Sequence, residues 1–304
     1  MEELIEFWEK PSVKNACLIA GWRQWADAGA TSSDLPKYLI EQTHAHRIGA
    51  LQSDPFYLFQ VPGTHALFRP EIKLVDGYPA ELRVKQNEIF FAENNDKSLL
   101  IFLGDEPQLN IERYAAAFFQ LAQDFRVRRV VTLGGVYGPV PYDKEREISC
   151  TYSLRKMKDE LAEYAVSFSN YEGGVSIGSY LADRAEKLDI ECLVFYAVVP
   201  LYDFSQLSPL LQTMLIEQDH KAWYDVMRRV NHLLKLGLDL SDLERASRQL
   251  VQSFDAKIAD LEKAMPQMRV REHLNKLTAN FVEPSFMPLD DVWKKGLGDL
   301  FKDL

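Results

Sequence analysis

Asp27 is the first residue whose type and position could support chemistry. It follows a short apolar segment together with Trp22 and Trp25. A carboxyl group beside two indole rings can have a raised pKa and act as an acid or a base. An aspartate at this place can equally cap the helix that follows, and the residues alone leave both interpretations open.

Other polar residues and glycines follow the apolar segments in a similar way. We predict that they line one pocket, and we assign no catalytic role to any of them. The pocket candidates are Gly21, Trp22, Asp27, Gly29, Asn87, Glu88, Glu106, Gly134, Gly135, Tyr171, Glu172 and Gly173.

The segment Gly174–Gly178 (GVSIG) matches the G-x-S-x-G pattern of a hydrolase nucleophile. That motif needs a buried strand directly before it, so that a strained turn can expose the serine. The preceding segment Ser167–Gly173 is polar, although Asp203 and His220 would keep the order of a catalytic triad. We therefore interpret these glycines as a turn that opens a helix.

The sequence indicates neither a metal nor a cofactor. Its six histidines do not cluster, and it lacks C-x-x-C, H-E-x-x-H and both common phosphate-binding loops. The Gly134–Gly138 segment could offer backbone N–H groups to an anion, but a reversal of the chain explains its glycines equally well.

Composition narrows the classes of protein. The chain has 304 residues, 47% of them hydrophobic, and a formal net charge of −10. These values indicate a globular protein that does not bind nucleic acid or anionic membranes, since both interactions need a basic surface. The three cysteines are far apart, no apolar run approaches membrane-spanning length, and the N-terminus is acidic. We expect free buried thiols and a cytoplasmic location.

Short apolar segments alternate with helical patterns over the first two thirds of the chain. This alternation predicts an α/β fold with a mostly parallel sheet covered by helices, in which ligands bind outside the carboxyl ends of the strands. A β-hairpin insertion is expected at about 56–93. The expected strands are 16–20, 47–51, 98–103, 129–133 and 191–199, and the expected helices are 27–40, 111–125, 153–164 and 175–187.

The chain then becomes helical. We divide it into an α/β domain at 1–205, a helical hairpin region at 206–265 with helices at 207–216, 221–236 and 240–265, and a linker and tail helix at 266–304. A narrow apolar seam on helix 240–265 must pack on helix 221–236 or on another subunit. The candidate oligomer contacts on this seam are Leu243, Leu250, Phe254, Ile258 and Leu261.

A series of short motifs resembles the proteasome assembly chaperone 2 (PAC2) family. The resemblance covers about residues 15–255 in the expected order. The motifs are Gly21–Gly29 (GWRQWADAG), Asn87–Phe90 (NEIF), Gly104–Pro107 (GDEP), Arg128–Gly134 (RRVVTLG), Tyr171–Gly173 (YEG) and Tyr196–Tyr202 (YAVVPLY).

The resemblance implies a three-layer α/β/α sandwich similar to nucleoside phosphorylases, a C-terminal helical region and oligomeric assembly. Archaeal and eukaryotic members help proteasome rings to assemble. This chain has Tyr142 and Leu201 where the family often has histidine, and Phe301–Leu304 lacks the ending with which relatives dock into proteasome rings. These differences weaken a catalytic function and a tail-mediated one, because neither Tyr142 nor Leu201 moves protons near neutral pH.

Two functions remain. The favoured one is a non-catalytic scaffold or protein-assembly factor that forms a homo-oligomer, of which a trimer is one candidate form, and that contacts a further protein. The alternative is a small-molecule-binding protein or an enzyme, of a nucleotide-dependent or phosphorylase- or ligase-like kind, that uses the pocket at the strand ends.

Overall fold

The computed structural model describes residues 4–61, 69–94, 97–204 and 214–286, and it contains one large mixed sheet and one separate hairpin. The large sheet has nine strands in the order β1-β3-β6-β7-β2-β8-β10-β11, with β9 also paired to β10. Its strands are β1 (Ile5–Phe7), β2 (Cys17–Arg23), β3 (His46–Leu51), β6 (Asn87–Asn94), β7 (Lys97–Asp105), β8 (Arg129–Gly138), β9 (Ile148–Tyr152), β10 (Glu191–Tyr202) and β11 (Met214–Leu215).

The centre of the sheet is parallel, as the sequence predicts. The neighbouring strands β7, β2, β8 and β10 all run in one direction, and the strands that flank them pair antiparallel. In β2, Leu18, Ile19 and Ala20 are fully buried, although their side chains alternate between the two faces. An uninterrupted apolar segment forms a central strand because helices cover both of its faces.

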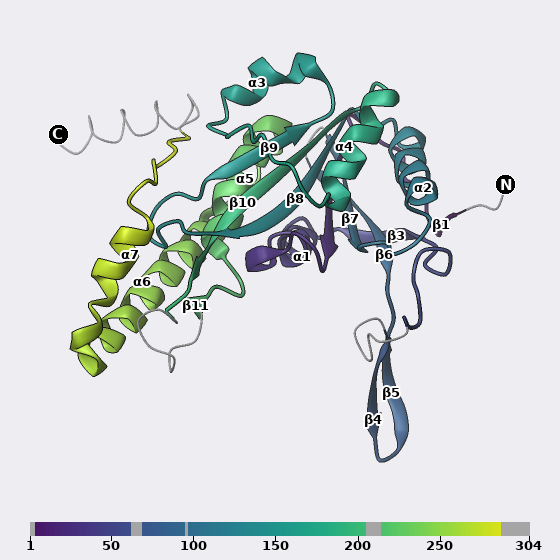
Figure 1. Ribbon diagram of the computed structural model, residues 1–304. Coiled ribbons are helices and arrows are strands. Elements are labelled where there is room, and N and C mark those ends of the chain that lie inside the picture. The colour runs from purple at the N-terminus through teal and green to yellow at the C-terminus, as the bar shows by residue number, and fades with distance from the viewer. Residues whose placement is uncertain (1–3, 62–68, 95–96, 205–213, 287–304) are drawn as a thin grey trace, which may run out of the picture.

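Helices cover the two faces of the sheet and complete the three-layer α/β/α fold (Figure 1). One face packs against α2 (Ile111–Asp124) and α4 (Ile177–Lys187). The other face packs against α1 (Asp34–Gln42), α3 (Lys158–Ala162) and α5 (His220–Leu234). The fold class expected from the sequence is therefore confirmed.

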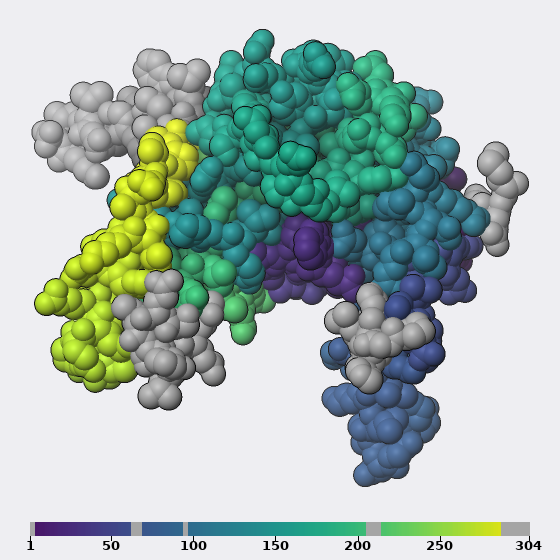
Figure 2. Space-filling model, viewed as in Figure 1, coloured from purple at the N-terminus to yellow at the C-terminus, as the bar shows by residue number. Residues whose placement is uncertain are grey.

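The hairpin of β4 (Glu71–Val75) and β5 (Tyr78–Arg83) projects from the body of the protein. Figures 1 and 2 show it standing clear of both helical layers. Every residue of both strands is exposed. It lies within the insertion that the turn residues Asp76 and Gly77 indicate in the sequence.

The C-terminal helices pack on the chain's own core. Helix α6 (Ser241–Ala264) runs beside α5 and is followed by α7 (Val270–Leu277) (Figure 1). Leu243, Phe254 and Ile258 are buried there, and the Phe254 ring lies 4.9 Å from the ring of Tyr142.

This packing corrects the assignment of the α6 seam to a subunit contact. Leu243, Phe254 and Ile258 are covered by the chain itself, and Leu250 and Leu261 are half-buried against the same core. The simpler alternative, a helical hairpin with the preceding helix, accounts for the seam.

Several elements differ from the expected ones. Strands β1 and β9 were not expected, Met214 and Leu215 form a strand where a helix was expected, and α7 occupies part of the expected linker. Pro266 begins a short 3-10 helix before α7, since a proline at the first helical position loses no hydrogen bond. The rest of the expected helix 207–216 up to residue 213, and the whole tail helix 289–304, lie outside the described residues.

Within the described residues, no helix is long and apolar enough to cross a membrane.

We predict that Phe254→Ala lowers the free energy of unfolding by about 3–5 kcal/mol, because it leaves a cavity between α6 and the aromatic rings beneath it. Chemical denaturation measures the change. The control is Val282→Ala, at a side chain that is 85% exposed, which we expect to change stability by no more than about 0.5 kcal/mol. Equal effects of the two substitutions would contradict the packing described for α6.

Candidate functional site

The carboxyl ends of the central strands lie at one edge of the sheet. There the segment after β2 crosses the end of β8, where Asp27 pairs with Gly135 in a β-bridge and the Gly135 N–H donates to the Ala26 carbonyl over 2.7 Å. A Cβ atom on Gly135 would lie 2.1 Å from the carbonyl oxygen of Ala28. Glycine is required here because two backbone segments touch.

Asp27 holds the turn that leads into α1, whose N-cap residue is Ser33. Its Oδ1 accepts hydrogen bonds from the N–H groups of Ser32 and Ser33 over 2.8 and 2.9 Å. Burial raises the pKa of Asp27, and the hydrogen bonds from Ser33 and Ser32 oppose this shift. The carboxylate of Asp27 therefore has a structural partner in the backbone just before α1.

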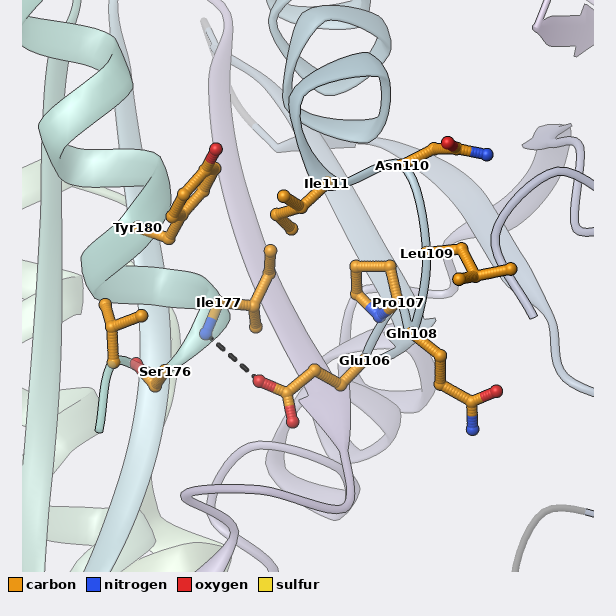
Figure 3. A pocket seen from close by; sticks show the side chains of 10 residues that line it. Glu106, Pro107, Gln108, Leu109, Asn110, Ile111, Ser176, Ile177 and Tyr180 are labelled. Carbon is orange, nitrogen blue, oxygen red and sulfur yellow. Dashed lines mark hydrogen bonds between the residues drawn. The ribbon is translucent and has the colours of Figure 1, made fainter. Parts of the chain in front are cut away.

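Glu106 lies at a cavity of about 220 Å³ between the N-terminal ends of α2 and α4 (Figure 3). Its Oε1 accepts a hydrogen bond from the N–H of Ile177, the first residue of α4, over 3.2 Å. Burial raises the pKa of Glu106. The cavity is lined by Glu106, Pro107, Gln108, Leu109, Asn110, Ile111, Val175, Ser176, Ile177 and Tyr180.

Ser176, the serine of the G-x-S-x-G segment, is the N-cap of α4. Its hydroxyl accepts from the N–H of Ser179 over 3.3 Å and forms a hydrogen bond with the hydroxyl of Tyr196. The Tyr196 hydroxyl also lies 2.7 Å from the Ser179 Oγ. Ser176 has an ordinary extended backbone, with φ −81° and ψ 162°, so it lacks the strain of a nucleophile turn.

Tyr196 also explains Gly134. The Tyr196 ring lies over this glycine, where a Cβ atom would come within 2.5 Å of the ring. Gly134 therefore leaves room for the ring of Tyr196, and Gly135 leaves room for the backbone of Ala28. This packing within the chain explains both glycines.

A buried chain of polar groups connects Trp22 with Asn87. Trp22 Nε1 donates to the Tyr114 hydroxyl over 2.8 Å, and the hydroxyls of Tyr114 and Tyr57 both donate to Asn87 Oδ1 over 3.0 and 2.8 Å. Asn87 Nδ2 is buried without a hydrogen-bond partner among the described residues. Neither Trp22 nor Asn87 lines the cavity beside Glu106.

The other pocket candidates also lie away from that cavity. Glu88 forms ion pairs with Arg47 over 3.3 Å and with Arg23 over 3.9 Å. Tyr171 and Glu172 are exposed on the loop before α4, and Gly173 lies against the Tyr171 hydroxyl.

Gly21 and Gly29 are packing positions. A Cβ atom on Gly21 would lie 1.9 Å from the Ser32 carbonyl oxygen. Gly29 has φ +62°, and its carbonyl accepts from Trp223 Nε1 over 2.8 Å and from the Asp219 N–H over 3.0 Å.

Sequence analysis missed a buried ion pair beside this edge. Arg146 and Asp219 are both fully buried, and Arg146 Nε donates to Asp219 Oδ2 over 2.8 Å. Asp219 also caps α5, where it accepts from the N–H groups of Lys221 and Ala222. A cap at Asp219 could be suspected from its place before a helix, but its partner lies 73 residues earlier in the chain.

Comparisons with known proteins support one family and one fold. The model of the PAC2 family matches residues 21–257. No curated protein matches the chain.

Three solved structures illustrate the shared fold. A proteasome-assembly chaperone homologue of Mycobacterium tuberculosis is 21% identical, with a TM-score of 0.68, over 80% of this chain and 95% of that chain. A Mycobacterium tuberculosis protein of unknown function is 17% identical, with a TM-score of 0.70, over 100% and 92%. An archaeal homologue of proteasome-assembly chaperone from Pyrococcus furiosus is 16% identical, with a TM-score of 0.53, over 86% and 99%.

We predict that Gly135→Ala lowers the free energy of unfolding by about 1–3 kcal/mol, because the added methyl group would overlap the Ala28 carbonyl. The matched control is Gly174→Ala, where nothing lies within 4 Å of the added atom. Thermal and chemical unfolding of both variants measure the difference. If Gly135→Ala proves as stable as Gly174→Ala, the crossing of the two segments is contradicted.

We predict that Glu106→Gln changes how the stability of the protein depends on pH. Because the pKa of Glu106 is raised above its ordinary value of 4.5, ionisation disfavours the folded state, and wild-type stability falls as pH rises through the folded pKa. The glutamine has no charge to desolvate and still accepts from Ile177. We expect the melting temperature of the variant relative to wild type to increase between pH 4 and pH 8. A difference that is constant or decreases over that range would contradict the burial of this carboxylate.

Proposed function

Because the chain belongs to the PAC2 family, we propose that it is a cytoplasmic, non-catalytic scaffold or assembly factor that works as a homo-oligomer. The fold shared with proteasome-assembly chaperone homologues supports an assembly role. The observation that carries the proposal is the exposed β4–β5 hairpin.

The hairpin has one apolar face and one charged face. Ile72 pairs with Leu82 in the register, and Leu74 follows on the same face because side chains alternate along a strand. These three side chains are 56%, 59% and 56% exposed. Burial of each would contribute about 1.5–3 kcal/mol, and the described residues of the chain leave this face uncovered.

An isolated hairpin also needs support. Two strands alone are at best marginally stable in water, and a further packed surface is needed for independent stability. The β4–β5 hairpin stands clear of the described part of the body (Figure 2), and we assign this support to another molecule.

The balanced charge of the hairpin makes a second copy of the chain the proposed partner of its apolar face. The face opposite the apolar one carries Glu71, Lys73, Glu81 and Arg83, two acids and two bases. Arg83 already pairs with Glu81 over 2.8 Å and lies 3.8 Å from Glu71. Two hairpins can therefore meet through their apolar faces without charge repulsion between them, whereas two whole chains, each with a net charge of −10, repel each other elsewhere.

The cavity beside Glu106 favours the alternative function, the binding of a small molecule. Its walls combine the Glu106 carboxyl with apolar side chains such as Ile111 and Ile177. Such a site would suit a ligand that donates hydrogen bonds to a carboxylate and has an apolar part. A ligand at 100 times its Kd would stabilise the protein by about 2.7 kcal/mol, which thermal melting against a metabolite set would detect. The absence of any stabilisation that depends on Glu106 would remove this alternative.

We predict that the double variant Leu74→Ser and Leu82→Ser dissociates the oligomer into monomers, because it removes most of the apolar face. The loss of about 1.5–3 kcal/mol for each side chain corresponds to at least a hundredfold weaker association for the pair. Size-exclusion chromatography with light scattering measures the mass across a range of concentrations.

The matched control is the double variant Lys73→Ser and Glu81→Ser, on the charged face of the same strands. We expect it to stay oligomeric, and all three proteins to have similar melting temperatures at high dilution. A wild-type protein that is monomeric at every concentration would refute the homo-oligomer. Equal oligomeric masses for the wild type and the Leu74→Ser, Leu82→Ser double variant would refute the hairpin as the contact.

A further inference from the structure

A second cavity, of about 330 Å³, lies at the opposite edge of the sheet from Glu106. It is formed where the strands β2, β7 and β8 begin and where α5 ends. Its lining residues are Asn15, Ala16, Cys17, Lys97, Arg128, Arg129, Glu160, Leu233, Leu234 and Lys235.

The lining is basic in an acidic protein. It contains two lysines, two arginines and one carboxylate, whereas the chain as a whole has a formal net charge of −10. A cavity that concentrates positive charge against the sign of the whole protein attracts anions locally.

Arg129 binds the one carboxylate of the lining, Glu160. Its Nη1 and Nη2 donate to the two oxygens of Glu160, each over 2.8 Å, and its Nε donates to Glu191 over 2.9 Å. The hydrogen bonds from Arg129 lower the pKa of Glu160, so this carboxylate is ionised at neutral pH. This one carboxylate faces four basic side chains, so the lining keeps an excess of positive charge.

The other three basic side chains of the lining are Lys97, Arg128 and Lys235. Lys97 donates a hydrogen bond to the carbonyl of Leu234, the last residue of α5, which holds its ammonium group at the cavity and balances the partial negative charge of the helix end. Arg128 and Lys235 are exposed, and the charge of Arg128 also acts on Glu160.

We propose that this cavity binds a compact polyanion that carries at least two phosphate or carboxylate groups. Its volume is within the usual range of small-ligand sites, about 300–1,000 Å³. Arg128 and Lys235 donate charge-assisted hydrogen bonds to the anion, and Lys97 contributes its remaining N–H groups. The proposal is independent of the oligomer, because none of these residues lies on the β4–β5 hairpin.

Titration calorimetry of the full chain at 0.15 M salt tests the site, with pyrophosphate and citrate as the two probes and acetate as the monovalent reference. We expect saturable binding of at least one polyanion with a stoichiometry of one per chain, and none of acetate. Binding of pyrophosphate alone indicates that the ligand is a phosphorylated metabolite, and binding of citrate alone indicates a polycarboxylate. Binding of both indicates a site that recognises charge. Each of these results supports the proposal.

The variants Arg128→Ala and Lys235→Ala should each weaken binding by about tenfold or more. Lys97 is left unchanged because it contacts the end of α5. The control is Lys263→Ala on α6, which removes the same charge from a lysine that lies 3.6 Å from Asp260 and far along the chain from the cavity. We expect this control to bind as wild type does, and all variants to keep the wild-type melting temperature.

Two results would overturn the proposal. One is that neither polyanion binds at this salt concentration. The other is that Arg128→Ala and Lys235→Ala bind as tightly as the Lys263→Ala control, which would show that the anions bind elsewhere on the chain.

Discussion

The fully buried pair of Arg146 and Asp219 is the constraint on which the rest of the structure depends. Removing two charges from water costs several kcal/mol per ion, and only complete hydrogen bonding can offset this. Arg146 meets that condition, because it donates to Asp219 and to the carbonyls of Pro141, Tyr142 and Lys144. Every element that supplies one of these acceptors is therefore held in place by the same charge.

This pair connects the sheet edge with the C-terminal helices. Asp219 begins α5, and the Asp219 N–H and the Trp223 indole both donate to the carbonyl of Gly29, in the segment that follows β2. The loop after β8 and the start of α5 are thus fixed relative to the end of β2. The carboxyl ends of the strands are therefore fixed by buried contacts. The β4–β5 hairpin, in contrast, has no support from the described part of its own chain.

Local patterns allowed much of the fold to be predicted from the sequence. The central strands were recognisable because helices on both faces demand uninterrupted apolar residues, as in Leu18–Ala20. Strand β1 could not be recognised from the sequence, because its three residues, Ile5–Phe7, form a strand only through pairing with β3. The site was harder for the same reason. Glu106 was selected for its position after a strand, but its contact with Ile177 joins residues 71 positions apart, and no local pattern encodes that distance.

The way in which the β4–β5 hairpin is attached to the sheet allows it to change without a change in the rest of the fold. Ala50 of β3 and Glu88 of β6 are register partners in adjacent strands, so the intervening stretch leaves the sheet and returns to it at neighbouring points. Such a segment can grow, shrink or be exchanged with little entropic cost to the body that carries it. The length and the side chains of the β4–β5 hairpin can therefore change, and with them the partner of the protein, while the α/β/α sandwich stays the same.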